Sequence, residues 1–80
     1  MNHDTEKVDE VVLALLTWTL FRDGGEARAW KGHAWEVMDR LFDQGWISDP
    51  QKKSKSVWLT DAGEQRAKEL FAKHFAAKSV

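Results

Sequence analysis

Apolar residues recur at the spacing of an α-helix over about Thr5–Phe21. At about 100° per residue, the apolar positions of this stretch cover an arc of about 220°, far wider than one packed face requires. This helix is therefore either covered on two sides within its own domain or buried on one side against another molecule. We expect Asp4 or Thr5 to cap its start, and Asp23, Gly24 and Gly25 to end it.

Two further stretches have helical spacing, and both have recognisable ends. The second helix is predicted over about Ala34–Gln44, where Gly45 supplies the left-handed residue after its end and Trp46 closes a Schellman motif by an apolar contact. The last helix is predicted over about Asp61–Ala77, with Thr60 as its N-cap. The expected apolar faces contain Ala34, Trp35, Met38, Leu41 and Phe42 in the second helix, and Ala67, Leu70, Phe71, His74 and Phe75 in the last.

Strand signals are shorter than the helical ones. Two strands are predicted at about residues 46–48 and 56–60, and the polar loop between them, which contains Pro50, makes them a β-hairpin. Residues 26–32 have no clear period and form either a short strand or an ordered loop, anchored by an inward-facing Trp30. The predicted order is helix, irregular segment, helix, β-hairpin, helix. This is one mainly α (α+β) domain over residues 1–80, with 1–4 and 78–80 frayed.

The composition restricts the functions that this domain can have. The 80 residues include no cysteine, which excludes a disulfide framework, a thiolate zinc site and a cysteine nucleophile. Charged residues make up 31%, too many for a membrane protein, and the longest apolar run, residues 11–21, is too short to cross a bilayer. The residues before that run are mainly acidic, unlike the basic start of a signal peptide. We therefore expect a cytoplasmic protein without a membrane partner.

Charge is distributed unevenly along the chain. The net charge of −1 combines −4 over residues 1–27, −1 over residues 28–49 and +4 over residues 50–80. Either the two ends attract each other within the domain, or they form a bipolar surface that meets a partner. The simplest sign of a nucleic-acid-binding protein, a strongly basic composition, is missing.

Residues 35–70 contain a familiar series of features. They are a helix end at Leu41, then Gly45, an apolar strand at Ile47, the basic loop Lys52-Lys53-Ser54-Lys55, a strand that ends in Leu59-Thr60, and Gly63. In this order and spacing they resemble the second half of winged helix-turn-helix regulators of the MarR and PadR type. The resemblance implies a reduced winged-helix-like fold, because residues 22–33 are too few for the strand, helix and turn expected before the recognition helix.

Two short segments carry a second resemblance, Arg28-Ala29-Trp30-Lys31-Gly32 and Ser48-Asp49-Pro50. With them, the whole chain is similar to a family of short stand-alone bacterial proteins without an assigned function. This resemblance is the closer of the two, and it implies no activity.

Candidate nucleic-acid contacts surround the basic loop, which corresponds to the wing in the first resemblance. Its lysines neutralise phosphates if the loop meets DNA, and a solvated loop that protects a hairpin edge is the alternative. The exposed face of the second helix carries Glu36, Asp39 and Asp43, which repel phosphate, so specific major-groove recognition by this helix is not expected. The candidate contacts are Lys52, Lys53 and Lys55 in the loop, and Arg28, Lys31 and His33 before the second helix.

The terminal helices supply the candidate protein interface. Winged-helix regulators of the resembling type dimerise through such helices, which correspond here to residues 5–21 and 61–77. In a twofold dimer one patch faces itself, and aromatic residues dominate such contacts. The alternative is that these side chains only cap the core of a monomer. The candidate interface residues are Trp18, Phe21, Leu13 and Leu20.

Catalysis and small-molecule binding find little support in the sequence. Acidic pairs such as Asp39 and Asp43 lie on a convex helix face, whereas acid–base chemistry needs a shielded cleft. His3, His33 and His74 are dispersed, so no metal site, cofactor or small-molecule substrate is expected. We therefore expect a non-catalytic regulatory or protein-interaction module that forms a homodimer or binds a protein partner. A DNA-binding transcriptional regulator that uses the basic loop is the alternative.

Overall fold

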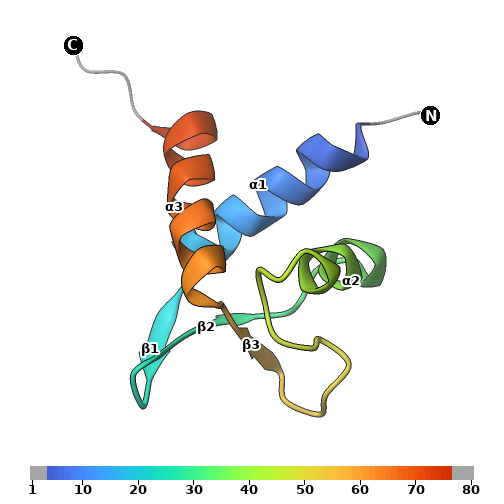
Figure 1. The fold of residues 1–80 in the computed structure, drawn as a ribbon, viewed down its shortest axis with the longest axis vertical. Coiled ribbons are helices and arrows are strands. Elements are labelled where there is room, and N and C mark those ends of the chain that lie inside the picture. The colour runs from blue at the N-terminus through green and yellow to red at the C-terminus, as the bar shows by residue number, and fades with distance from the viewer. Residues whose placement is uncertain (1–3, 77–80) are drawn as a thin grey trace.

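Six elements of secondary structure follow one another in the computed structural model, which describes residues 4–76 (Figure 1). Their order is helix, two strands, helix, strand, helix, so the α+β class predicted from the sequence is confirmed. The predicted fraying of residues 1–3 and 78–80 and the predicted helix end at Ala77 lie outside the described residues. The elements are α1 (Thr5–Trp18), β1 (Phe21–Asp23), β2 (Glu26–Trp30), α2 (Trp35–Asp43), β3 (Ser56–Trp58) and α3 (Asp61–Phe75).

α1 begins where the sequence predicts and ends earlier than predicted. Asp4 is its N-cap, and the Asp4 carboxylate accepts a hydrogen bond of 3.1 Å from the Lys7 N–H. Asp4 is thus the N-cap, the first of the two candidates predicted from the sequence. The helix ends at Trp18 rather than at Phe21, because Phe21 already belongs to β1.

The segment between the first two helices contains a β-hairpin formed by β1 and β2. Its turn is Gly24-Gly25, and both glycines have positive φ angles, 58° and 86°, which the favoured two-residue hairpin turn requires at both positions. Of the two alternatives for residues 26–32, the strand is therefore correct. Trp30 is 57% exposed, so the prediction that it faces inward is wrong. Ala27 and Ala29 face the core instead, because side chains alternate along a strand.

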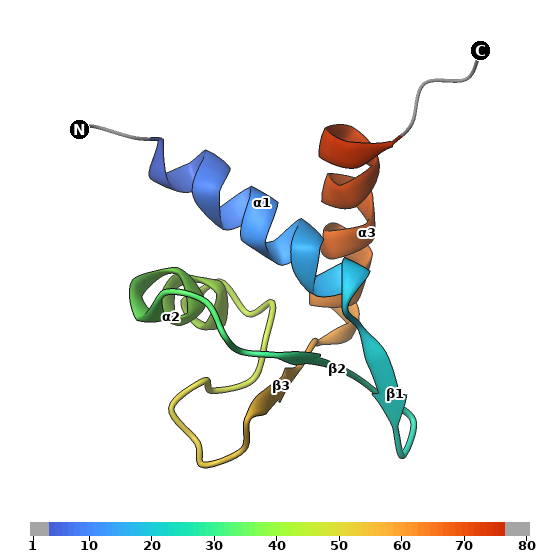
Figure 2. The ribbon, with the colours of Figure 1, turned by 180° about the vertical axis from the view of Figure 1, so that it is seen from behind.

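The three strands form one antiparallel sheet in the order β1-β2-β3, so β2 is the central strand. Arg28 of β2 lies opposite Phe21 of β1 and opposite Trp58 of β3. The sheet lies below α1 and α3 in the views of Figures 1 and 2. Its two faces differ, because Val57 is buried on one face whereas Trp58, the next residue, is 42% exposed on the other.

The hairpin predicted between residues 46–48 and 56–60 is present as a short extension of this sheet. Ile47 and Leu59 form an isolated antiparallel bridge. The Ser48 N–H donates to the Trp58 carbonyl at 2.9 Å, and the Thr60 N–H donates to the Trp46 carbonyl at 3.0 Å. The pairing is confirmed, and only residues 56–58 of it form a regular strand.

The end of α2 is the Schellman motif predicted from the sequence. Gly45 has a φ of 83°. The Gly45 N–H donates to the Phe42 carbonyl at 2.9 Å, and the Trp46 N–H donates to the Leu41 carbonyl at 3.0 Å. These bonds satisfy carbonyls that a helix end leaves free. The buried face of α2 is rotated from the predicted one: it contains Val37, Met38 and Leu41, whereas Ala34, Trp35 and Phe42 are exposed.

Thr60 and Gly63 join the start of α3 to the end of α2. The Thr60 hydroxyl accepts a hydrogen bond from the Gly63 N–H at 2.9 Å and donates to the Gly45 carbonyl at 2.7 Å, so Thr60 is the N-cap as predicted. Gly63 lies against the backbone of Trp46, where an added Cβ would be 2.7 Å from the carbonyl carbon. Only glycine fits there, and this packing explains why Gly63 follows Leu59-Thr60 in the sequence.

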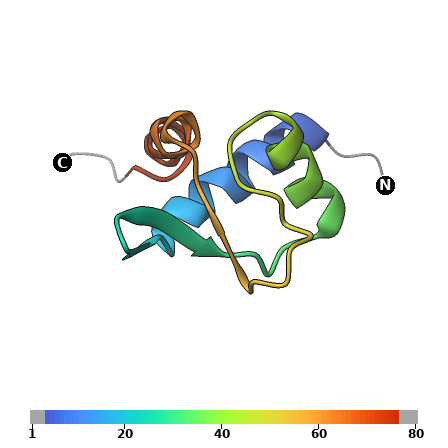
Figure 3. The same cartoon turned by 60° about the horizontal axis from the view of Figure 1, so that its bottom comes forward.

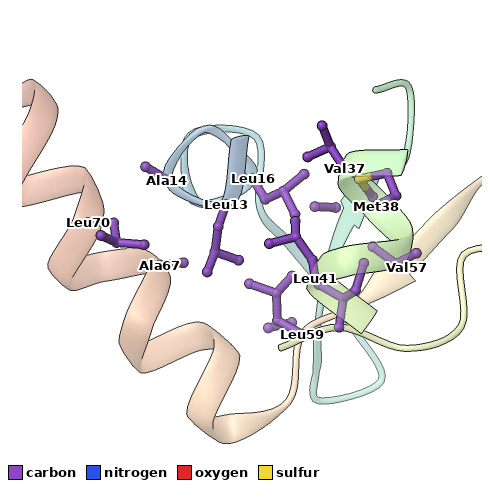
Figure 4. Close-up of a cluster of buried hydrophobic side chains, with 13 residues drawn as sticks. Leu13, Ala14, Leu16, Val37, Met38, Leu41, Val57, Leu59, Ala67 and Leu70 are labelled. Atoms are coloured by element: carbon purple, nitrogen blue, oxygen red, sulfur yellow. The ribbon is translucent and has the colours of Figure 1, made fainter. Parts of the chain in front are cut away.

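The core lies between the three helices and the inner face of the sheet (Figure 4). α1 packs against both α2 and α3 (Figure 3). Leu13 and Leu16 of α1 are at most 1% exposed, and Leu70 of α3 is 1% exposed. The buried apolar residues are Leu13, Ala14, Leu16, Ala27, Ala29, Val37, Met38, Leu41, Ile47, Val57, Leu59, Ala67 and Leu70.

Candidate functional site

Lys31 connects the basic loop to the end of β2. Figure 3 shows this loop in yellow near the end of that strand. The Lys31 N–H donates to the Lys55 carbonyl at 3.2 Å. The Lys31 ammonium donates to the Pro50 carbonyl at 2.6 Å and also to the Lys52 carbonyl. We call residues 49–55 the basic loop. Lys31 therefore shapes this loop, and most of the hydrogen-bonding capacity of its ammonium is used within the protein.

Arg28 links the sheet to the same loop. Its guanidinium donates to the Glu26 carboxylate at 2.7 Å, to the Ser56 hydroxyl at 2.9 Å and to the Ser54 hydroxyl at 3.3 Å. The Arg28 side chain is only 17% exposed, and Glu26 neutralises its charge. Arg28 therefore positions the basic loop and adds little free positive charge.

The three lysines of the basic loop present their charges to solvent. Lys52, Lys53 and Lys55 are exposed, and none of them has a carboxylate of residues 4–76 within ion-pair distance. The Asp49 carboxylate accepts a hydrogen bond of 2.9 Å from the Gln51 N–H. The sixth predicted contact, His33, is half-buried, and its N–H donates to the Lys31 carbonyl at 2.9 Å. The three loop lysines, Lys31 and His33 thus lie together at one end of the sheet, and Arg28 reaches the loop from the middle of β2.

Two exposed tryptophans lie on the same side of the sheet as Arg28, and the sequence did not indicate this arrangement. Trp30 lies opposite Ser56 and Trp58 opposite Arg28, so the two rings are diagonal neighbours on one side of the sheet. The Phe21 ring packs on the Trp30 ring, with centroids 5.0 Å apart. The alternation in Glu26–Trp30, with alanine at every second position, is the signal that points Trp30 outward. We call this surface the outer sheet face: Phe21, Arg28, Trp30, Ser56 and Trp58.

The exposed side of α2 is acidic, as predicted. Glu36 and Asp43 are exposed, and the third predicted acid, Asp39, is half-buried. The Arg40 guanidinium donates to the buried Asp9 carboxylate of α1 at 2.6 and 2.9 Å. This hydrogen-bonded carboxylate raises the pKa of Arg40 above its ordinary value, because it stabilises the charged guanidinium. The only basic residue of α2 is therefore engaged with α1, which strengthens the argument against major-groove recognition by this helix.

A second exposed surface runs along the outer side of α1. Val11 and Leu15 are half-buried there, and Trp18 is 74% exposed. Val8 is also half-buried and packs against the edge of the core. We call these four residues the α1 strip. The Trp18 ring stacks on Phe71 of α3, with centroids 5.8 Å apart and ring planes at 10°. The wide apolar arc of the first helix is thus covered by the core on one side and partly open to solvent on the other.

Of the four predicted interface residues, only Trp18 belongs to the α1 strip. Leu13 is 1% exposed and lies in the core on the opposite side of the helix, so its prediction as an interface residue is wrong. Leu20 is half-buried and packs against the core. Phe21 lies on the outer sheet face, where it contacts Trp30. A helical wheel gives the angle of each side chain but does not show which angle the rest of the fold covers.

Ion pairs join the two ends of the chain. Glu10 of α1 lies 3.2 Å from the Lys73 ammonium and 3.0 Å from the His74 ring of α3. Hydrogen bonds with His74 and Lys73 lower the pKa of Glu10. On α3, hydrogen bonds with Arg22 and Lys68 lower the pKa of Glu64. Ion pairs between the first and last segments therefore neutralise part of the opposite charges at the two ends of the chain.

A cleft of about 230 Å³ lies between the three helices. Leu13, Leu41 and Leu70 form its floor, and two acids on its rim, Asp9 and Glu10, are held in ion pairs with other helices. Among residues 4–76, no three histidine, aspartate or glutamate side chains gather as a metal site requires. Over the same range, no helix has both the length and the apolar character needed to cross a bilayer.

Similar proteins are known over almost the whole length of the chain. A family model described as "Domain of unknown function (DUF6429)" matches residues 4–77. The uncharacterized protein y4hR of Sinorhizobium fredii is 49% identical over 75 residues, which are 94% of this chain and 97% of that protein. No solved structure matches the chain. The predicted resemblance to a family without an assigned function is confirmed, and the chain belongs to the DUF6429 family.

Proposed function

We propose that this protein is a non-catalytic interaction module of a regulatory kind, which forms a homodimer through its terminal helices. The observation that carries this proposal is the α1 strip, in which Trp18 is 74% exposed and three aliphatic side chains are only half-buried. Burial of such side chains against a partner contributes about 25 cal/mol per Å². A single small domain has little reason to leave them in water, and a joined apolar surface is typical of an interaction site.

The spacing of the α1 strip is symmetric, which supports a second copy of the chain as the partner. Residues 8, 11, 15 and 18 are separated by three, four and three positions. If two copies of α1 pack antiparallel about a twofold axis near residue 13, Val11 meets the partner's Leu15 and Val8 meets the partner's Trp18. Every apolar position then faces an apolar position, as in the a and d seam of a coiled coil.

α3 widens this surface beside Trp18. Phe71 stacks on Trp18, and the Phe75 ring lies 5.4 Å from Phe71 and is 42% exposed. Large aromatic side chains are enriched among the residues that dominate protein interfaces. The two terminal helices therefore offer one joined apolar surface, in accordance with the dimerising helices that the winged-helix resemblance implies.

The positions of the acidic side chains support the non-catalytic part of the proposal. Asp9 is buried and bound by Arg40, and Glu10 is bound by Lys73 and His74. These carboxylates hold α1 against α2 and α3. A general base needs a free carboxylate or histidine within hydrogen-bond reach of a substrate proton, whereas these groups already have partners on neighbouring helices.

Sedimentation velocity tests the dimer at protein concentrations from about 1 μM to 1 mM, the range that covers moderate and weak association. Trp18→Ala is expected to weaken the dimer by about 30-fold or more, the effect of losing one dominant interface residue. Leu15→Glu is expected to abolish it, because a charge would be buried at the centre of the strip. Trp58→Ala is the matched control, an exposed tryptophan outside the strip. A strict monomer over the whole range overturns the proposal.

The second candidate function is nucleic-acid binding, as in a DNA-binding transcriptional regulator that uses the basic loop. The gathering of Lys52, Lys53 and Lys55 beside Lys31 at one end of the sheet favours it. Phosphate contacts are strongest at low salt, so binding assays at about 50 mM salt are the test. Changing the three loop lysines to Glu is expected to abolish binding. If the protein binds no nucleic acid at this salt, this second function is wrong.

A further inference from the structure

The outer sheet face carries two indole rings that the proposed dimer does not use. Trp30 is 57% and Trp58 is 42% exposed. Arg28 is adjacent to both, two positions before Trp30 on the same strand and directly opposite Trp58. Its guanidinium is held by Glu26 and Ser56, so the centre of this face is ordered before any ligand arrives. The face is therefore a preformed surface with two aromatic rings on one side of a sheet.

Positive charge lies at one end of this face. Lys31 follows Trp30 in the chain, and its N–H donates to the Lys55 carbonyl. The last residue of the basic loop therefore lies next to the end of β2 that holds Trp30. At the opposite end the acids Asp23 and Glu26 lie opposite each other on β1 and β2. The charge thus runs from acidic at the glycine turn to basic at the loop, and a negatively charged ligand is attracted to the end that holds Trp30.

We propose that the outer sheet face and the basic loop bind single-stranded nucleic acid. Unpaired bases stack on Trp30 and Trp58, and phosphates contact Lys52, Lys53 and Lys55. This inference rests on the nucleic-acid function proposed second above and names its ligand. Stacking on aromatic side chains tolerates every base, because each base has a π face. Binding therefore has little sequence preference and depends strongly on salt.

The geometry favours a single strand over a duplex. In a duplex the bases stack on one another and present only their edges in the grooves, so rings on a sheet do not reach a base face. α2, which corresponds to the recognition helix in the winged-helix resemblance, is acidic on its exposed side, with Glu36 and Asp43. A nucleic-acid strand also supplies the closely repeated negative charge that attracts three lysines without a carboxylate partner among residues 4–76, and an ordinary protein surface does not.

Fluorescence anisotropy with a labelled oligothymidylate of about 15 nucleotides, near the upper end of common site sizes, tests the stacking. Trp58→Ala and Trp30→Ala are each expected to raise the Kd by about five- to 150-fold. Trp58→Phe keeps an aromatic face and retains most of the affinity, whereas Trp58→Leu does not. Trp18→Ala is the matched control, since it removes an even more exposed tryptophan from the α1 strip and leaves the Kd unchanged.

The salt dependence tests the phosphate contacts. Each phosphate contact on a single strand contributes about 0.7 to the slope of log affinity against log salt. Changing Lys52, Lys53 and Lys55 together to Gln is therefore expected to reduce the magnitude of this slope by about 2. As the control, three exposed lysines of α1 and α3 are changed to Gln in the same way, which leaves the slope unchanged. The control residues are Lys7, Lys68 and Lys73.

The outcomes separate this inference from the function on which it rests. Oligothymidylate binding that is unaffected by both tryptophan variants, or duplex binding that is equally tight, overturns the inference and leaves nucleic-acid binding in place. No binding of either form at about 50 mM salt overturns both. If thermal melting shows that Trp30→Ala does not fold, the comparison of Trp58→Ala with Trp58→Phe decides the question.

Discussion

The α1 strip and the outer sheet face both place tryptophan in water, yet they differ in what surrounds it. Trp18 lies among aliphatic side chains and stacks on Phe71 of the neighbouring helix. Trp58 lies opposite Arg28 on the sheet, and Trp30 precedes a lysine that anchors the basic loop. One surface offers only apolar area, whereas the other offers aromatic rings with free positive charge at the Trp30 end and the acids Glu26, Asp61 and Glu64 beside Trp58.

This difference teaches that exposure of a large side chain does not by itself identify a partner. An apolar surface is stabilised most by a partner that is apolar as well, because water is then removed from both surfaces. A second copy of α1 is such a partner. An aromatic surface with positive charge at one end binds most tightly to a ligand that carries negative charge as well as flat rings. The two surfaces are therefore expected to respond differently to substitutions, salt and acid.

The largest expected effect comes from the glycine that supports both surfaces. In Gly63→Ala the new Cβ would lie 2.7 Å from the carbonyl carbon and 2.9 Å from the Cα of Trp46. Alanine improves helix propensity by about 1 kcal/mol, but this clash with backbone is expected to cost about 4 kcal/mol or more. Thermal unfolding followed by circular dichroism measures the net loss. Gly32→Ala is the matched control, because a Cβ at Gly32 meets nothing within 4 Å. Equal melting of the two variants contradicts this account of Gly63.

The two sides of α1 are compared by a pair of leucine substitutions. Leu13 is 1% exposed in the core, and Leu15 is half-buried on the strip. Leu13→Ala is expected to lower the free energy of unfolding by about 3 kcal/mol, because it leaves a cavity. Leu15→Ala is expected to cost less than about half of that and to weaken the dimer instead. Urea unfolding and sedimentation measure the two effects. A larger loss of folding stability for Leu15→Ala would place the strip inside the core.

Salt separates the two surfaces without a substitution. A tenfold rise in salt, from about 50 to 500 mM, is expected to lower oligothymidylate affinity about 100-fold, on the basis of three phosphate contacts. The dimer is expected to change by less than about twofold, since apolar contacts are not screened by salt. Anisotropy and sedimentation in the same buffers measure both constants. A dimer that dissociates at high salt would show that charge, rather than the α1 strip, holds it together.

The smallest expected effect is the response to acid, which tests the ion pairs beneath the two surfaces. His74 and Lys73 lower the pKa of Glu10, and Arg22 and Lys68 lower the pKa of Glu64. A lowered pKa in the folded state means that this contribution to stability is present above about pH 4.3, the ordinary value for Glu. It is lost as the pH falls through the lowered folded-state values.

Urea unfolding between pH 7 and pH 3 measures this acid response, at about one pH unit per step. Glu64→Gln is expected to flatten the decline in stability, because it removes one of the two responsible carboxylates. Glu69→Gln on the same helix is the control, since within residues 4–76 Glu69 has only a 3.9 Å contact with Arg66. An unchanged pH profile in Glu64→Gln would show that the Arg22–Glu64 pair contributes nothing to folding.

Local chemistry in the sequence determined the start of α1, the end of α2 and the start of α3. Asp4 or Thr5 was expected to cap α1, and Asp4 does so. Gly45 with Trp46 and the cap at Thr60 were predicted from residue type alone and are confirmed. These features are predictable because a cap or a left-handed glycine involves groups only a few positions apart in the chain.

Which surfaces are open was decided only by the tertiary structure. The sequence showed that α1 has too wide an apolar arc, but only the packing of α2 and α3 placed Leu13 in the core and left Trp18 exposed. In the same way, the hairpin at Gly24-Gly25 turned Trp30 outward, and pairing of β2 with β3 brought Lys31 to the basic loop. The alternation in Glu26–Trp30 places Trp30 on the side of the strand opposite Ala27 and Ala29. Which side of a helix or strand is covered depends on contacts between residues far apart in the chain, and only the tertiary structure shows those contacts.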